Sequence, residues 1–187
     1  MRIISGEAKG RTLFAPQGAE TRPTSDKIRG SVFNIIGARM VDARVLDLFG
    51  GTGALALEAL SRGAAFAAIS DSARAALQAI ERNARNVAGE SFDRRVRIIR
   101  ADYRAAIEKV AGPFDLVFLD PPYRMADAYA DAVKRLADAG KLAKDCLIVM
   151  ERQKAVQIRL DERFESFDAR AYGDTVVEFA RLREADV

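Results

Sequence analysis

The spacing of hydrophobic and polar residues changes near residue 44. Before it, residues 1–15 alternate loosely between apolar and polar side chains and contain two glycine turn signals, which predicts a short β-hairpin. A loop with prolines and glycine over 16–23 leads into a helix that Thr24 or Ser25 can cap. Apolar residues recur along this helix at helical spacing, at Ile28, Val32, Ile35 and Ile36.

Beyond residue 44, short apolar runs alternate with helical patterns. The apolar runs predict strands at 44–49, 65–70, 96–100, 114–120 and 147–151. Helices are expected between them, at 55–63, at about 72–87, from about 103, and at about 126–139. Strands at 163–172 and 175–183 flank Gly173-Asp174, a hairpin turn signal. This order predicts an α/β protein with a parallel, doubly wound sheet and a terminal antiparallel pair, which ordinary dinucleotide-binding folds lack.

Composition limits the chemistry that is available. With 187 residues, 49% hydrophobic and 30% charged, the chain is expected to form one globular domain, with at most a short appendage. There is no histidine, which excludes Ser-His-Asp triads, Cys-His pairs and zinc sites built on histidine. The single cysteine, Cys146, lies in an apolar run and is expected in the core, and no metal is expected. No apolar stretch suits a membrane span or a signal peptide, so we expect a cytoplasmic protein.

Positive charge is concentrated at the N-terminus. The net charge is +3, yet residues 1–39 carry seven Lys and Arg against three Asp and Glu, so this segment has +4 and the remainder −1. A basic segment on a near-neutral body is typical of an arm that binds a polyanion. It is equally typical of a solvated, lightly basic surface, and charge alone leaves both interpretations open.

A glycine turn follows the first strand of the sheet, in the segment 47–53 (Asp-Leu-Phe-Gly-Gly-Thr-Gly). Ligands of open α/β sheets bind beyond the carboxyl ends of the strands. Asp47 disfavours a pyrophosphate there, but it suits the ammonium group of a methionine moiety. Asp71 ends the second strand and can accept from ribose hydroxyls, or else cap the next helix, and Asp102 after the third can accept from an adenine amine. Carboxylates at three successive strand ends predict a nucleoside site.

The fourth strand ends in Asp120-Pro121-Pro122-Tyr123. Two prolines give a rigid, extended exit and remove two backbone donors, which leaves the Asp120 carboxylate and the Pro121 carbonyl as free acceptors. These two acceptors can hold both hydrogens of an exocyclic base amine and direct its lone pair at a sulfonium methyl group. Tyr123 can stack on the base, which must be unpaired or flipped out of a helix. The alternative is a surface turn covered by Tyr123.

These residues resemble the class I methyltransferases that carry the Asp-Pro-Pro-Tyr motif for amino methylation. The chain is also similar to the RsmD family, which methylates N2 of a guanine in 16S ribosomal RNA of the small subunit. The similarity covers nearly the whole chain, in the segments 2–13, 22–26, 29, 32–35, 46–64 and 172–175. The Arg-Pro-Thr element at 22–24 is its specific part, because the Asp-Pro-Pro-Tyr motif also occurs in adenine and cytosine enzymes.

The resemblance implies a Rossmann-like fold with a seven-stranded, mainly parallel sheet and a terminal antiparallel hairpin. It implies an N-terminal extension over 1–40 that contacts RNA and a methyltransferase domain over 41–187. S-adenosylmethionine contacts are expected at Asp47, Phe49, Gly50, Gly51, Gly53, Asp71 and Asp102, and catalysis at Asp120, Pro121, Pro122 and Tyr123. RNA contacts are expected at Arg2, Lys9, Arg11, Arg22, Thr24, Lys27 and Arg29. The expected partner is ribosomal RNA or a small-subunit assembly particle, and the expected state is a monomer.

The chain departs from the family at three places. The family usually has Glu where Asp71 stands, a Val-rich second strand where residues 67–70 read Ala-Ala-Ile-Ser, and Glu-Thr where Gly30 and Ser31 follow Arg29. Three alternatives to guanine methylation are considered. An adenine-N6 methyltransferase acting on DNA or RNA would share the motif. A nucleic-acid-binding module without catalysis would not need it, and a dinucleotide-dependent oxidoreductase is disfavoured by Asp47 and by the missing Gly-x-Gly-x-x-Gly pattern.

Overall fold

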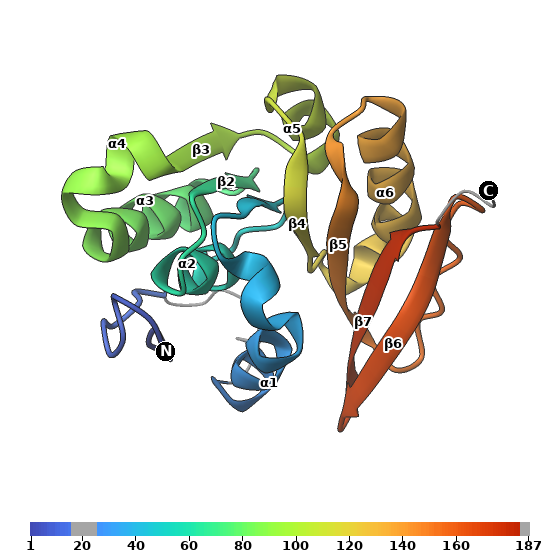
Figure 1. The fold of residues 1–187 in the computed structure, drawn as a ribbon, viewed down its shortest axis with the longest axis horizontal. Helices are drawn as coiled ribbons and strands as arrows, with labels where there is room; N and C mark the ends of the chain where they lie inside the picture. The colour runs from blue at the N-terminus through green and yellow to red at the C-terminus, as the bar shows by residue number, and fades with distance from the viewer. Residues whose placement is uncertain (16–25, 184–187) are drawn as a thin grey trace.

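A seven-stranded sheet forms the centre of the protein. The computed structural model describes residues 1–15 and 26–183 (Figure 1). The strands are β1 (Arg44–Asp47), β2 (Phe66–Asp71), β3 (Val96–Arg100), β4 (Phe114–Leu119), β5 (Leu142–Gln153), β6 (Phe164–Tyr172) and β7 (Thr175–Leu182). Their order is β3-β2-β1-β4-β5-β7-β6, with the first five parallel and β7 antiparallel to both of its neighbours. The expected mainly parallel sheet with a terminal antiparallel hairpin is confirmed.

Helices cover both faces of this sheet. They are α1 (Asp26–Ile36), α2 (Ala54–Ser61), α3 (Arg74–Ala88), α4 (Phe92–Arg95), α5 (Tyr103–Lys109) and α6 (Ala128–Asp138), with 3-10 turns η1 (Gly37–Met40), η2 (Gly89–Ser91) and η3 (Tyr123–Met125). Side chains alternate along each strand, so Phe118 packs with α1, α2 and α3, whereas Val117 packs with α5 and α6. Because β1 to β5 are parallel, the loops that follow them lie together at the carboxyl ends of the strands, where ligands of such sheets bind.

The N-terminal segment is part of the folded core. Ile3 donates its amide to the Arg11 carbonyl at 2.9 Å and accepts from Gly10 at 2.9 Å, which closes the expected hairpin. Its buried side chains share one hydrophobic cluster with α1, α2 and β1. A Cβ on Gly6 would lie 1.7 Å from the Ser61 carbonyl oxygen, so only glycine allows the hairpin to approach α2 this closely. Packing therefore continues across residue 40, where the sequence predicted a boundary between two regions.

Two elements differ from the sequence prediction. β5 begins at Leu142 instead of 147, because the strand continues through the exposed polar residues Lys144 and Asp145, which interrupt the apolar run. The short helix α4 was not predicted, since four residues are too few for a periodic pattern. Cys146 is 1% exposed and lies in the core as expected, where burial raises the pKa of its thiol.

Candidate active site

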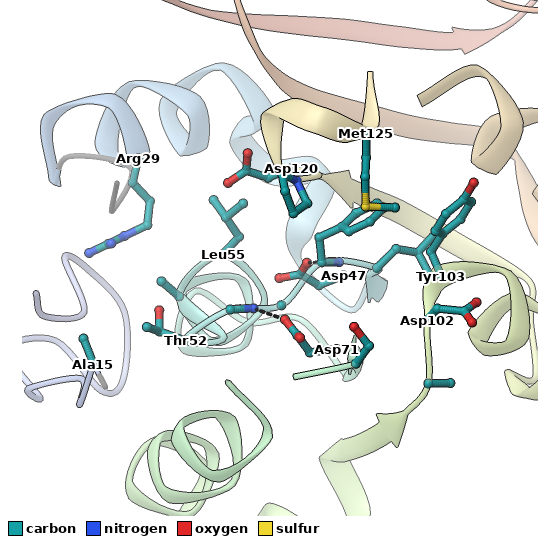
Figure 2. A pocket seen from close by; sticks show the side chains of 18 of the residues that line it. Ala15, Arg29, Asp47, Thr52, Leu55, Asp71, Asp102, Tyr103, Asp120 and Met125 are labelled. Carbon is teal, nitrogen blue, oxygen red and sulfur yellow. Dashed lines mark hydrogen bonds between the residues drawn. The ribbon is translucent and has the colours of Figure 1, made fainter. Parts of the chain in front are cut away.

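A cavity of about 410 Å³ lies at the carboxyl ends of β1, β2, β3 and β4 (Figure 2). It brings together most of the predicted cofactor and catalytic residues: Asp47, Phe49, Gly50, Gly51, Asp71, Asp102, Asp120 and Pro122. Gly53 stands behind this lining as the first residue before α2, and Pro121 and Tyr123 are also outside it. Arg29 is the one predicted RNA-binding residue, among those the structure describes, that lines the cavity.

The glycine turn brings backbone to the cavity wall. A Cβ on Gly50 would lie 2.5 Å from Ile69 Cγ2, and the Gly50 amide donates to the Ser70 carbonyl at 2.8 Å. Gly51 has a φ of +56°, a conformation that side chains rarely adopt. The sequence therefore uses glycine where the loop after β1 must press against β2, and the loop leaves room for a ligand above it.

Asp47 is the last residue of β1 and is 2% exposed. Its Oδ1 accepts from the Phe49 amide at 3.3 Å, which is a long hydrogen bond. Burial raises the pKa of Asp47 to about 7 and the nearby Asp71 charge adds to the effect, while the backbone amides of Phe49 and Ala56 oppose it. A buried carboxylate with so little compensation gains strongly from a cationic ligand group.

The other two cofactor carboxylates are already held by backbone amides. Asp71 bridges two loops, because Oδ2 accepts from Gly51 at 2.9 Å and Oδ1 accepts from Ala73 at 2.8 Å. Asp102 caps α5, with Oδ1 accepting from Arg104 at 2.9 Å and from Ala105 at 3.0 Å. The N-cap residue of α3 is Ala73, which has no side-chain capping bond, so Asp71 holds the turn before that helix and is not its N-cap. No described residue donates to Asp102 Oδ2, which stays free for a ligand amine.

Asp120 follows directly after β4 and faces the cavity (Figure 2). Within residues 1–15 and 26–183, nothing donates a hydrogen bond to its carboxylate or to the Pro121 carbonyl. Burial raises the pKa of Asp120 well above its ordinary value, and the charges of Glu151 and Asp47 raise it further. The turn thus presents two acceptor groups without donors, as the double proline predicted.

Tyr123 opens η3 immediately after the turn and is 56% exposed. The Pro122 carbonyl accepts from Met125 at 2.8 Å and closes this turn, which places Met125 in the cavity lining. Tyr123 therefore leaves a ring face open to solvent beside the turn, where a base could stack on it.

The predicted RNA-binding residues divide into two groups. Arg2, Lys9, Arg11 and Lys27 are exposed, and the Arg11 guanidinium donates to the Asn86 carbonyl. Arg29 is 0% exposed and so does not belong to the basic side chains that face solvent, and its RNA contact stays a prediction. Arg22 and Thr24 lie outside the described residues. The segment 1–40 thus offers basic side chains to solvent on the hairpin and on the first turn of α1.

The Arg29 guanidinium lies next to one backbone carbonyl and two carboxylates. Its Nη2 donates to the Arg2 carbonyl and to Asp26 Oδ1, the latter at 3.1 Å, and its Nε lies 3.8 Å from Glu58 Oε2. Burial lowers the pKa of Arg29, while Asp26 and Glu58 oppose that shift. The sequence contained a signal for this position, because residue 29 shares the helical face of the buried residues at 32, 33 and 36.

Several cavity residues carried no motif in the sequence. Leu55, Tyr103 and Met125 add apolar surface, and the rings of Phe49 and Tyr103 pack at 5.4 Å between centroids. The Tyr103 hydroxyl donates to Asp131 at 2.7 Å, which fixes the ring. Such walls are typical of small-molecule sites, which surround a few polar groups with apolar surface. Only the position of Tyr103 directly after Asp102 could have indicated it.

The described residues contain no cluster of three or more metal-ligating side chains. Among the helices of the same ranges, none has the length and apolarity to cross a membrane. The polar side chains that line the cavity are carboxylates, guanidinium groups and the hydroxyls of Thr52, Ser72 and Tyr103.

The sequence and the fold are similar to those of known proteins. Residues 1–181 match the family described as Conserved hypothetical protein 95. Ribosomal RNA small subunit methyltransferase D of Escherichia coli strain K12 is 36% identical over 154 residues, which cover 82% of this chain and 75% of that protein. YlbH of Bacillus subtilis strain 168 is 37% identical over 162 residues, with coverages of 84% and 85%. The solved structure of the Escherichia coli yhhF protein has a TM-score of 0.85 at 31% identity and covers 97% of both chains.

Proposed function

Because the chain belongs to the RsmD family of methyltransferases, as its motifs predicted, we propose that it methylates the exocyclic N2 amine of a guanine in 16S ribosomal RNA, with S-adenosylmethionine as donor. The observation that carries this proposal is the Asp120 carboxylate, which accepts no hydrogen bond from the described part of the chain and lines the same cavity as Asp47 (Figure 2). The E. coli relative is named as a methyltransferase of small-subunit ribosomal RNA, which supports the substrate class.

The cavity residues fit the polar groups of S-adenosylmethionine. Asp47 suits the ammonium group, since the buried carboxylate has one long hydrogen bond of its own. Asp71 keeps acceptor capacity for the ribose hydroxyls, and the free Oδ2 of Asp102 suits the adenine amine. The backbone at Gly50 and Gly51 allows close approach, and Phe49 adds apolar surface. When bound, the cofactor supplies an electrophilic methyl group on a sulfonium centre.

The turn after β4 is suited to orienting the amine that accepts the methyl group. The Asp120 carboxylate and the Pro121 carbonyl each accept one amine hydrogen, which turns the nitrogen lone pair away from them and toward the donor. The amine nitrogen that accepts the methyl group must lose one proton, and the Asp120 carboxylate is placed to take it. Tyr123 holds the base by stacking, which contributes about 1–3 kcal/mol in comparable sites.

The exposed hairpin and the start of α1 would hold the RNA. Arg2, Lys9, Arg11 and Lys27 offer positive charge to phosphates, and Arg22 and Thr24 remain predictions from the sequence. The target base must be unpaired or flipped to reach the turn. Such contacts make binding weaken steeply as salt rises. Charge reversal at Lys9 and Lys27 should reduce both the RNA affinity and its salt dependence, and an unchanged affinity would exclude this surface.

The decisive experiment is nucleoside analysis of ribosomal RNA from cells that lack the gene, before and after incubation with the enzyme and the cofactor. We expect N2-methylguanosine to appear with the wild-type protein and to be absent with Asp120→Ala. N6-methyladenosine in its place would assign the enzyme to adenine. Equal incorporation by both proteins would remove Asp120 from the mechanism, and no incorporation by either would favour a binding module.

A further inference from the structure

Positive charge in the cavity is scarce and unevenly placed. Of the described residues that line it, Asp47, Asp71, Asp102 and Asp120 are acidic, whereas Arg29 and Arg124 are basic. Arg124 is exposed and follows the catalytic turn, while Arg29 is fully buried on α1. In Figure 2, Asp47 and Asp71 lie between Asp102 and Arg29. The buried cation therefore stands at the end of the cavity away from the predicted adenine contact.

The hydrogen bonds of Arg29 are incomplete. Nη2 donates to the Arg2 carbonyl and to Asp26, but neither Nε nor Nη1 has a hydrogen-bond partner among residues 1–15 and 26–183, although both atoms are buried. A buried guanidinium with unused N–H groups is unfavourable, because those groups lose their water without replacement. Such a group either destabilises the folded protein or lies where a ligand accepts the remaining hydrogen bonds.

Glu58 does not complete it. Its Oε2 lies 3.8 Å from Arg29 Nε, beyond hydrogen-bond distance, and accepts from the Ile4 amide at 2.8 Å. Its Oε1 accepts from Ser5 at 3.0 Å and from Arg62 at 2.7 Å. This carboxylate is already shared among the hairpin and α2, so the Nη1 hydrogens of Arg29 remain available to an anion that enters the cavity.

We propose that Arg29 binds the carboxylate of the methionyl group of S-adenosylmethionine, with Nη1 as the donor. The inference rests on the proposed function for the identity of the cofactor. If adenine lies at Asp102 and ribose at Asp71, the amino-acid end of the cofactor would extend toward Asp47 and Arg29, which lie on the other side of Asp71 from Asp102 in Figure 2. Asp47 then takes the ammonium and Arg29 the carboxylate, so that each charge of the zwitterion meets an opposite charge that the protein alone leaves poorly compensated.

Calorimetric titration with two ligands isolates this contact. S-adenosylhomocysteine carries the carboxylate, whereas 5′-methylthioadenosine has the same nucleoside and sulfur without the amino-acid end. Arg29→Gln should weaken S-adenosylhomocysteine binding about 10- to 100-fold, the usual cost of losing a charged hydrogen bond, and leave 5′-methylthioadenosine within about twofold. Arg29→Lys should retain part of the preference. Loss of affinity for both ligands alike, or for neither, would overturn the proposal.

Two further variants serve as controls. Arg124→Gln removes the other cavity cation and should leave the ratio of the two affinities unchanged; a collapse of the ratio there would assign the carboxylate to Arg124. Should Arg29→Gln fail to fold, the double variant Arg29→Gln/Glu58→Gln removes both buried charges and must show the same selective loss. If the wild-type protein binds neither ligand, the cofactor assignment fails and not the role of Arg29 alone.

Discussion

The four carboxylates of the cavity fall into two pairs. Asp71 and Asp102 each accept two backbone hydrogen bonds of 2.8–3.0 Å, so loops and a helix end fix them before any ligand arrives. Asp47 has one long hydrogen bond and Asp120 has no donor among the described residues. Burial raises the pKa of both, and the charge of Asp47 raises the pKa of Asp120 further.

The difference separates positioning from chemistry. The first pair holds the loops that form the site, and its hydrogen bonds to backbone amides stabilise the folded protein without a ligand. The second pair is held near its place by strand ends, and its unused acceptor capacity becomes favourable only when a cation or an amine enters. Variants of the first pair should therefore affect stability, and variants of the second pair should affect turnover and pH dependence.

The largest effect is expected for Asp120→Asn. The amide keeps the shape of the side chain but removes a charged acceptor and the proton acceptor, so kcat should fall about 10²- to 10³-fold, as for other losses of one electrostatic group. Affinity for S-adenosylhomocysteine should change little, and stability should not decrease. Single-turnover methyl transfer and calorimetry check these outcomes. A variant with normal kcat would place Asp120 with the structural pair.

The second effect concerns Asp47 and pH. Its pKa is raised to about 7, so below that pH the protonated form is favoured in the free protein. The folded state therefore binds a proton more tightly than the unfolded state, and the free energy of unfolding should fall as pH rises from about 4 to about 7. The full contribution is about 4 kcal/mol at most, from a shift of about three pH units at 1.36 kcal/mol each. An ammonium ligand favours the ionised form, so S-adenosylhomocysteine affinity should rise up to about tenfold per pH unit below 7 and then level off.

Asp47→Asn tests this assignment directly. It should remove the pH dependence of binding below pH 7 and the proton release seen when calorimetry is repeated in buffers of different ionisation enthalpy. Asp120→Asn should retain most of that dependence, because burial and the charge of Asp71, and not Asp120, raise the pKa of Asp47. Proton release that survives in Asp47→Asn would transfer the titration to Asp120.

The same division explains what the sequence could predict. The sheet followed from apolar runs alternating with helical patterns, and strand ends located Asp47, Asp71, Asp102 and Asp120 without any contact being known. Hydrogen-bond partners could not be predicted, since the bond from Gly51 to Asp71 joins two loops twenty positions apart. The sequence therefore indicated which carboxylates face the ligand but not which of them are already compensated.

Arg29 shows where reasoning from composition fails. Its basic neighbours suggested a solvent-facing arm, yet helical spacing places position 29 with the buried face of α1. Hairpin residues that contact Glu58 complete the enclosure, and they lie more than fifty positions from it in sequence. Charge content could not distinguish a buried cation from an exposed one, whereas periodicity could.

The smallest effect is expected for Asp102→Ala. This substitution removes the two hydrogen bonds that cap α5 and should lower the free energy of unfolding by about 1 kcal/mol, the usual cost of an N-cap. In a domain of this size that corresponds to about 2–4 °C in Tm. Asp127→Ala is the matched control, because Asp127 stands at the N-cap of α6 without a side-chain hydrogen bond and should cost less than half as much. Equal losses in thermal melts would show that charge at a helix start, and not the hydrogen bonds of Asp102, provides the stabilisation, and the contrast between positioned and uncompensated carboxylates would then lose its structural basis at α5.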